Sequence, residues 1–174
     1  MNRDLNLHVP LFEELDYRQN LLSQSDTMSY NKGYELEMEN YNNETGCIDF
    51  RSEYWDEWYH RWINKGPDKF YAYIKDEIGG AFVGEVSFRY ESSNNAHCIG
   101  IVIENKHRGK GYCKKGLTLL SEKAFMDLGV DKLRNDIPVD RVFAIKGHKK
   151  AGFKEICVEN GICVLELSKE DYIK

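Results

Sequence analysis

Residues 97–128 contain an apolar run, a basic loop with two glycines and an amphipathic helical pattern, in that order. The loop reads Lys-His-Arg-Gly-Lys-Gly over residues 106–111. A helix that begins directly after such a loop points its unpaired first-turn N–H groups, and the positive end of its dipole, toward the same place as the basic side chains. The pattern therefore predicts a strand, loop and helix unit that binds a phosphate group.

Two better-known phosphate-binding loops do not fit these residues. Gly111 and Gly116 have the outer spacing of a nucleoside triphosphatase loop, but Leu117 and Thr118 follow where Lys and Ser or Thr are required. A dinucleotide-binding fingerprint fails because Lys114 holds the position of its third glycine. The alternative that remains is an ordinary basic loop that caps a helix.

Hydrophobic periodicity predicts a mixed α/β chain. The expected elements are, in order, a strand at 5–9, helices at 10–22 and 52–64, strands at 70–75, 81–90 and 97–103, a helix at 111–128, a strand at 132–139, a helix at 141–151, and strands at 153–158 and 162–167. Asn160-Gly161 predicts a tight hairpin between the last two strands. Ser52 and Asp140 are the expected helix N-caps. Residues 23–50 show no clear period, and we expect a loop with one helical turn at most.

Composition indicates one globular domain over residues 1–174. Hydrophobic residues make up 41% of the chain and charged residues 30%, which is ordinary for such a domain. No apolar run approaches the roughly 18 residues of a membrane span, and the first residues lack a secretory segment. The five cysteines are scattered and do not form metal-type pairs. We therefore expect a cytoplasmic protein with reduced thiols, and neither a membrane nor a metal as partner.

Charge is unevenly distributed along the chain. Residues 1–68 hold 14 acidic and 6 basic residues, a net charge of −8, whereas residues 69–174 hold 15 and 18, a net charge of +3. The basic half suits an anionic cofactor, and the acidic half suits a cationic acceptor such as an amine. The total of −5 disfavours nucleic acid as a partner. An aromatic stripe in the acidic half is expected to be core first, and acceptor pocket as the alternative: Trp55, Trp58, Tyr59 and Trp62.

The basic loop and its flanks resemble the acyl-CoA-binding motif of the GNAT family of N-acetyltransferases. That motif has Gln or Arg, two residues, Gly, one residue, and Gly or Ala, and the corresponding residues here are Arg108, Gly111 and Cys113. Cys113 departs from the motif but is still small. The resemblance covers residues 70–157 well and residues 1–68 poorly.

A second segment about thirty residues later also resembles the family. The family pattern has Asn, two residues, Ala-Ile, two residues, Tyr, one residue, Lys, one residue and Gly-Phe; here its places hold Arg141, Ala144-Ile145, His148, Lys150 and Gly152-Phe153. Arg141 and His148 are departures from that pattern. Two matching segments at the family's separation make chance a poor explanation.

The resemblance implies a mixed, mostly antiparallel central sheet with helices on both faces. Residues 1–68 would supply acceptor-side helices and loops, and residues 69–174 the acetyl-CoA-binding core. It further implies that the pantetheine arm pairs with the backbone of one strand end, at Ile101, Val102 and Ile103. The pyrophosphate would lie against the loop N–H groups, those of Arg108, Gly109, Lys110, Gly111, Tyr112 and Cys113, with added charge from the Arg108 and Lys110 side chains.

Acetyl transfer to an amine requires that the ammonium lose a proton, directly or through water. Glu85 is the first candidate base and Glu104 the second, with water left open, while Asp136 is expected to be structural or acceptor-binding. Many family members place a Tyr near the departing sulfur to protonate it, and the corresponding residue here is His148. An imidazole could donate that proton. Gly147 beside it could make room for the cofactor.

The expected activity is transfer of acetyl from acetyl-CoA to the primary amine of a small molecule, by direct attack in a ternary complex without a thiol intermediate at Cys113. Two alternatives stay open. One is a protein N-terminal or lysine acetyltransferase, and the other is an acyl-CoA-binding sensor without catalysis. A homodimer is possible, and the sequence does not specify the acceptor.

Overall fold

The computed structural model describes residues 4–36, 38 and 40–174. Its sheet has the strand order β1-β2-β3-β4-β5-β7-β6, and every neighbouring pair is antiparallel except β4 with β5. The strands are β1 (Leu5–His8), β2 (Lys69–Asp76), β3 (Phe82–Glu91), β4 (Ala96–Ile103), β5 (Lys132–Pro138), β6 (Lys154–Glu159) and β7 (Ile162–Ser168). The predicted mixed, mostly antiparallel sheet is confirmed.

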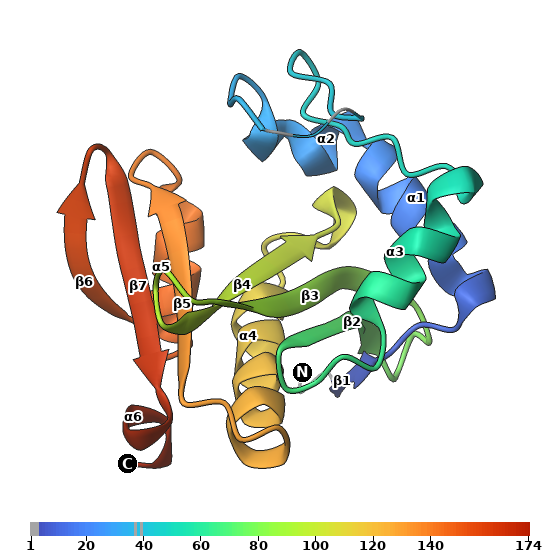
Figure 1. Cartoon of the computed structure of the whole chain (residues 1–174). Helices are drawn as coiled ribbons and strands as arrows, with labels where there is room; N and C mark the ends of the chain where they lie inside the picture. The colour runs from blue at the N-terminus through green and yellow to red at the C-terminus, as the bar shows by residue number, and fades with distance from the viewer. Residues whose placement is uncertain (1–3, 37, 39) are drawn as a thin grey trace.

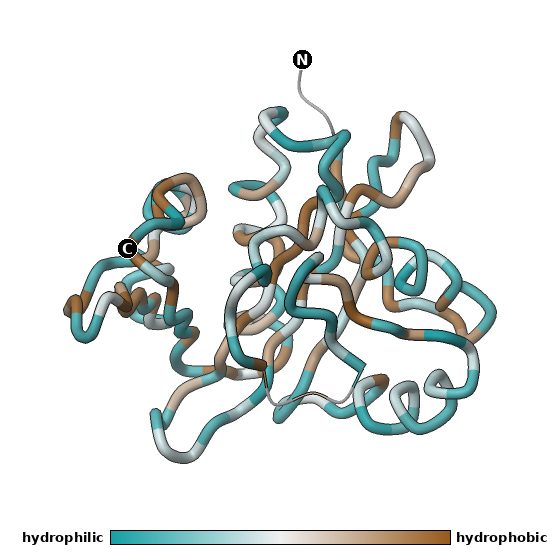
Figure 2. Tube along the Cα trace, turned by 90° about the horizontal axis from the view of Figure 1, so that it is seen from above, coloured by the Kyte–Doolittle hydropathy of each residue, from teal (hydrophilic) through white to brown (hydrophobic). Residues whose placement is uncertain are grey.

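Helices lie on both faces of this sheet, as predicted (Figure 1). The α-helices are α1 (Leu15–Ser23), α2 (Ser25–Met28), α3 (Trp55–Trp62), α4 (Tyr112–Glu122), α5 (Val142–Lys150) and α6 (Lys169–Ile173). The hydrophobic stretches of the chain run mainly along the inner strands, and the outer loops are mostly hydrophilic (Figure 2). In the part of the chain that the structure describes, no helix is long and apolar enough to cross a membrane.

Helix α4 packs closely on one face of the sheet. Leu117 and Leu120 are completely buried in the main hydrophobic cluster, as the helical period predicts. Gly116, between these leucines and the loop, lets α4 approach β2 closely, because a Cβ at this position would lie 2.6 Å from Ile74 Cδ1. The helix continues through a π-helical turn (Lys123–Asp127) and stops at Gly129, whose φ is +70°.

The opposite face is covered by α1, α2 and α3. Two smaller clusters lie here, one around Leu15, Leu22 and Phe50 and one around Tyr71 and Tyr73. The aromatic stripe of α3 is half-buried against both clusters, so its expected role in the core is confirmed. Helices α1, α2 and α3 thus form a layer of their own, separated by the sheet from α4.

The parallel strands β4 and β5 separate after a short contact. They pair at two positions, His97 with Leu133 and Cys98 with Arg134, and in the described chain no further β4–β5 pair follows. Beyond Cys98, β4 keeps its antiparallel partner β3 up to Ile103, opposite Gly84. The carboxyl ends of β4 and β5 therefore diverge, which is visible in Figure 1.

Several helix boundaries differ from the sequence predictions. The helix expected from Ser52 begins with a 3-10 turn (Ser52–Tyr54), so Arg51 takes the N-cap position. The N-cap of α5 is Arg141 rather than the expected Asp140, whose carboxylate accepts a hydrogen bond from the Tyr34 hydroxyl at 3.4 Å. The region 23–50 contains α2 and a 3-10 turn (Ser29–Asn31), and α6 was not predicted.

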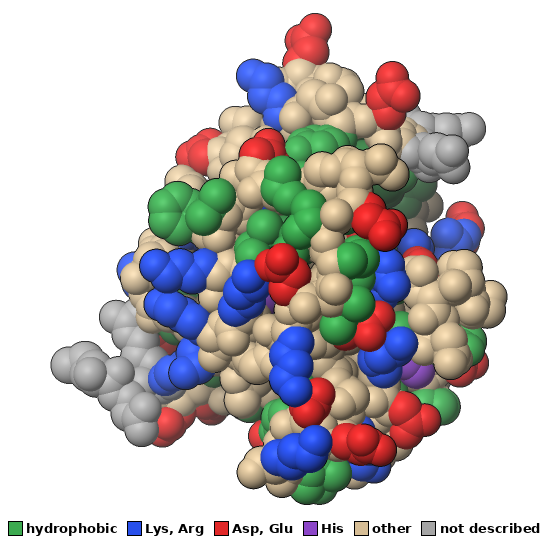
Figure 3. Space-filling model, turned by 90° about the vertical axis from the view of Figure 1, so that its left-hand side faces the viewer, with side chains coloured by type: hydrophobic (Ala, Val, Ile, Leu, Met, Phe, Trp, Pro, Cys, Tyr) green, Lys and Arg blue, Asp and Glu red, His purple; other side chains and the backbone are tan. Residues whose placement is uncertain are grey.

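The outer edge of the sheet is β6. It exposes Ile156 and Val158 on a face that also carries many Lys and Arg side chains (Figure 3). Its register with β7 is interrupted between Glu155 and Cys157. The predicted turn between the two strands is confirmed, with positive φ at Asn160 and Gly161.

The pairing of β3 with β4 depends on Gly84. A Cβ at this position would lie 2.1 Å from the Val102 carbonyl oxygen and 3.1 Å from Ile103 Cα, both backbone atoms that cannot rotate away. Gly84→Ala should therefore lower the free energy of unfolding by about 3 kcal/mol or more in urea denaturation. Gly79→Ala is the matched control, since a Cβ there meets ordinary contacts and the expected change is about 0.5 kcal/mol or less. Equal stability of the two variants would contradict this account.

Candidate active site

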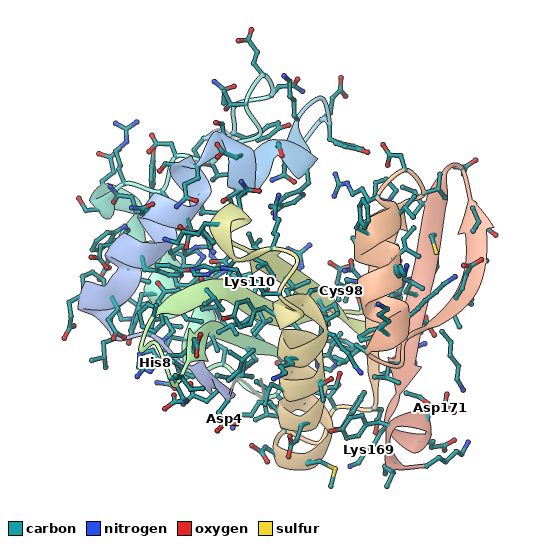
Figure 4. The ribbon with its side chains drawn as sticks, turned by 180° about the vertical axis from the view of Figure 1, so that it is seen from behind. Asp4, His8, Cys98, Lys110, Lys169 and Asp171 are labelled. Atoms are coloured by element: carbon teal, nitrogen blue, oxygen red, sulfur yellow. The ribbon has the colours of Figure 1, made fainter. Side chains whose placement is uncertain are left out.

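The loop between β4 and α4 exposes backbone rather than side chain. Gly109 and Gly111 have φ values of +74° and +82°, and a Cβ on either would meet open space. Gly111 is the N-cap of α4 and has no side chain with which to cap it, so the first-turn N–H groups of the helix point into the loop. Lys110 lies on the same loop (Figure 4). Exposed backbone and positive charge at a helix N-terminus are of the kind that binds phosphate.

Arg108 differs from its expected use. Its guanidinium donates to the carbonyl oxygens of Ile103 at 3.1 Å and Thr27 at 2.5 Å. Its backbone N–H donates to Asn105 O at 3.1 Å. Its guanidinium therefore holds the loop against α2, and its backbone N–H closes a turn within the loop. The surface available to a phosphate is accordingly formed by the residues after Arg108.

The remaining loop residues have distinct surroundings. Lys110 Nζ donates to Lys106 O at 2.9 Å on the protein surface. Tyr112 is buried, and its hydroxyl donates to Asp76 Oδ2 at 2.9 Å, so only its backbone belongs to the loop. Cys113 lies under α5, and burial raises the pKa of its thiol. A protonated thiol is a poor nucleophile, which fits the expectation of direct transfer.

Gly147 has a packing role. A Cβ at this position would lie 3.0 Å from Cys113 Sγ. The absence of a side chain thus lets α5 approach α4. The hypothesis that Gly147 makes room for a cofactor is wrong in this respect, since its space is already taken by the Cys113 thiol.

The end of β4 lies in the opening between the diverging strands. Ile101 and Ile103 pack in the main cluster with α4, whereas Val102 packs in the cluster around Leu15, Leu22 and Phe50. On one side this segment pairs with β3, and on the other it has already separated from β5. An amide-bearing ligand can therefore pair with this strand edge through the backbone, irrespective of these apolar side chains.

Residues 24–34 span the two diverging strand ends. Near β4, Gln24 Nε2 donates to Glu104 Oε1 at 2.9 Å, and the backbone N–H of Asn105 donates to Thr27 Oγ1 at 3.0 Å. Near β5, Arg141 donates to the Tyr30 carbonyl, and its guanidinium carbon lies 4.5 Å from the centroid of the Tyr34 ring. We call this segment the roof. The roof closes one end of the opening between β4 and β5. Its helix α2 lies above the end of β4 in Figure 1.

Glu104 is one of the anchors of the roof. Its side chain is buried, and Oε1 also lies 3.0 Å from Lys106 Nζ. The carboxylate therefore already has an amide and an ammonium as partners. Asp136 lies exposed on β5 in a surface ion pair with Arg134 at 2.8 Å, away from the roof.

Glu85 lies on β3, paired in register with Val102 and Tyr73. Arg18 Nη1 lies 2.5 Å from each of its carboxylate oxygens, and the Tyr71 hydroxyl donates to the same carboxylate. Burial alone would lower the pKa of Arg18, but the adjacent Glu85 raises it above its ordinary value. The result is a buried ion pair whose disruption by loss of one partner typically costs about 3 to 5 kcal/mol.

His148 is enclosed, with 1% of its surface exposed. Its Nδ1 lies 2.8 Å from Ala144 O, so that nitrogen carries the proton, and Nε2 accepts from Asn135 Nδ2 at 2.9 Å. Burial lowers the pKa of the imidazole, which favours this neutral form. The ring therefore joins α5 to β5, and in this arrangement it has no N–H directed at the opening.

The structure brings together the loop, the end of β4 and Glu104, as the sequence predicted. It separates Glu85 from His148: Glu85 is held by Arg18 of α1, whereas His148 lies on α5 and contacts Asn135 of β5. Sequence reasoning missed Arg18 as the partner of Glu85. The only signal in the sequence was a charged residue within the apolar pattern of the first helix.

Comparisons with known proteins agree with this geometry. The model of the acetyltransferase (GNAT) family matches residues 30–153. The structure is similar to that of a spermidine N-acetyltransferase from Vibrio cholerae in complex with CoA and spermine, with 17% identity, a TM-score of 0.74 and 98% of each chain covered. It is also similar to a GNAT-family acetyltransferase from Bacillus anthracis, with 14% identity, a TM-score of 0.70 and 98% of each chain covered. No curated protein matches the sequence significantly.

The family match includes the diverging strands, the basic loop, α5 and residues 30–34 of the roof. The two structures share the complete fold with this chain, although their sequences are distant from it. Because the family model matches more than half of the chain, the chain belongs to the GNAT family of acetyltransferases.

Proposed function

We propose that this protein transfers an acetyl group from acetyl-CoA to the primary amine of a small molecule in a ternary complex. The observation that carries the proposal is the opening between β4 and β5, which has the phosphate-binding loop at one side and is closed by the roof at one end. A spermidine N-acetyltransferase with the same fold binds CoA and spermine, which supports an amine of this size class.

The donor fits the residues of this opening. The pyrophosphate of acetyl-CoA would lie against the backbone of Gly109 and Gly111, where the space next to each Cα is open. The pantetheine arm would follow the free edge of β4 at Ile101, Val102 and Ile103. This geometry directs the thioester between the strands, toward the acceptor side of the sheet.

The roof favours a small acceptor over a protein. A polypeptide substrate needs a groove that is open at both ends, whereas residues 24–34 bind to both strand ends through Glu104 and Arg141. The acidic character of residues 1–68 attracts a cationic amine. Together these features support a small, positively charged acceptor.

The proton of the attacking ammonium leaves through water in this proposal. Of the candidates, Glu85 is held by Arg18 and Tyr71, and Glu104 by Gln24 and Lys106. Both oxygens of Glu85 are taken by these partners. Oε2 of Glu104 is buried and has no hydrogen-bond partner among the described residues, so a water chain in the opening can pass the proton to it without any rearrangement.

The loop assignment predicts the effect of Gly111→Asp. The new carboxylate would lie where the pyrophosphate binds, and repulsion at about 4 Å should weaken acetyl-CoA binding by roughly 100-fold or more in calorimetry. The fold should survive, because the position is open and Asp tolerates a left-handed conformation better than most residues.

Gly161→Asp is the matched control for this measurement. It has a similar φ of +77° and equally open surroundings, but it lies in the β6–β7 turn. It should bind acetyl-CoA as the unmodified protein does. If Gly111→Asp and Gly161→Asp bind acetyl-CoA equally well, the loop is not the donor site.

The surroundings of His148 predict a positioning role rather than a role as acid. His148→Gln should keep kcat within about tenfold of the unmodified protein at saturating substrates, whereas loss of a general acid typically costs 10²- to 10⁴-fold. A drop of that larger size, without a change in acetyl-CoA affinity, would restore the acid hypothesis.

The same variant should change the pH dependence of stability. Because burial lowers the pKa of folded His148, its contribution to stability is present above the unfolded pKa of about 6.5 and is lost as pH falls below it toward the folded pKa. Between pH 7 and 5, urea denaturation should therefore show a smaller loss of stability for His148→Gln than for the unmodified protein. Burial also lowers the pKa values of His97 and His107, but both remain in the variant and cancel in the difference.

The activity itself is tested by thiol release from acetyl-CoA across polyamines, aminoglycosides, amino acids and peptides. We expect turnover with small amines, with an apparent affinity that weakens as salt is raised. Turnover with peptides alone would favour the protein acetyltransferase. Tight acetyl-CoA binding without thiol release for any amine would favour the sensor.

A further inference from the structure

One nitrogen of Arg18 has an unusual set of partners. Its Nη1 lies 2.5 Å from Glu85 Oε1, 2.5 Å from Glu85 Oε2 and 3.2 Å from the Tyr71 hydroxyl oxygen. The Nε of the same side chain is buried, and among the described residues it has no hydrogen-bond partner. Three oxygens therefore surround a single nitrogen, while another donor of the guanidinium is unused.

Three aromatic rings enclose the same charge. The guanidinium carbon of Arg18 lies 4.7 Å from the centroid of the Trp58 ring, 5.0 Å from that of Phe50 and 5.2 Å from that of Tyr71. These distances are within the range of cation–π attraction. The Arg18 and Glu85 side chains still expose 15% and 11% of their surfaces, so the cluster is not sealed.

This arrangement suits an ammonium group better than a guanidinium. A primary ammonium has three donors on one nitrogen, which match three oxygens around one point. A guanidinium spreads five donors over a planar fork, and matches a carboxylate best when two of its nitrogens each bind one oxygen. Here both carboxylate oxygens bind the same nitrogen, and Nε is left without a partner.

We propose that Glu85, Tyr71, Phe50 and Trp58 form a subsite for an alkylammonium group, and that this chain fills the subsite with its own Arg18. Arg18 is then a specificity-determining residue. By occupying the subsite and neutralising Glu85, it excludes a second positive charge of the acceptor from this place. The part that concerns the acceptor rests on the function proposed above, whereas the subsite itself does not.

Arg18→Ala tests the subsite without any acetyl transfer. The variant leaves the Glu85 carboxylate without its cation, so its melting temperature should be lower than that of the unmodified protein. In the absence of acetyl-CoA, n-butylammonium chloride should raise the melting temperature of the variant by about 3 °C or more in a saturable manner. Sodium chloride at the same ionic strength and 1-butanol at the same concentration should not.

The matched control is the double variant Arg18→Ala/Glu85→Gln, which lacks the carboxylate that would bind the ammonium. It should not respond to n-butylammonium, and neither should the unmodified protein, whose subsite is filled. An equal response in all three proteins, or no response in Arg18→Ala, would overturn the proposal. If Arg18→Ala is unfolded in buffer, refolding by n-butylammonium but not by 1-butanol supports the subsite, and a chain that stays unfolded at every concentration refutes it.

Kinetics then test the role in specificity. Relative to the unmodified protein, Arg18→Ala should raise kcat/KM for an alkyl diamine over that for the monoamine of equal length by about tenfold, because the second ammonium gains the subsite. An unchanged ratio in a variant that binds n-butylammonium would refute the specificity role and leave the subsite. If the unmodified protein acetylates no amine, the proposed function fails, but the melting experiment still decides the subsite.

Discussion

The parallel contact between β4 and β5 is the constraint on which the rest of the site depends. The two strands hold each other through His97 and Cys98 and then separate, so the backbone at the end of β4 has a strand partner on one side only in the described chain. A strand edge without a neighbouring strand needs other contacts to hold its position in the fold. Here the loop after β4 is fixed by Arg108, and the roof joins that loop to the start of α5 through Arg141.

Much of this architecture could be predicted from the sequence, because it rests on local patterns. The alternation of apolar residues specifies the strands, and the spacing of Leu117, Leu120 and Ala124 specifies the buried face of α4. The glycines of the basic loop adopt the left-handed conformations that their positions suggest. Similarity to the family over two segments was sufficient for the mixed central sheet with helices on both faces, whereas α6 was not predicted.

The partners of the charged side chains could not be predicted in the same way. Arg18 and Glu85 are 67 residues apart, and Arg108 reaches carbonyls of α2 that are about as distant in the sequence. Such contacts depend on how two layers meet, and no period in the sequence encodes that. His148 illustrates the same limit, since the family pattern specifies its place on α5 but not the enclosure of its ring by Asn135 and Phe153.

The sheet divides the molecule into two layers that pack in separate hydrophobic clusters. α1, α2 and α3 cover one face and α4 and α5 the other, and their hydrophobic clusters are separate. Substitutions in one layer therefore leave the packing of the other nearly unchanged. If the acceptor binds on the first layer and acetyl-CoA on the second, as proposed, such a chain can evolve toward a new acceptor through its first third while the donor site stays intact.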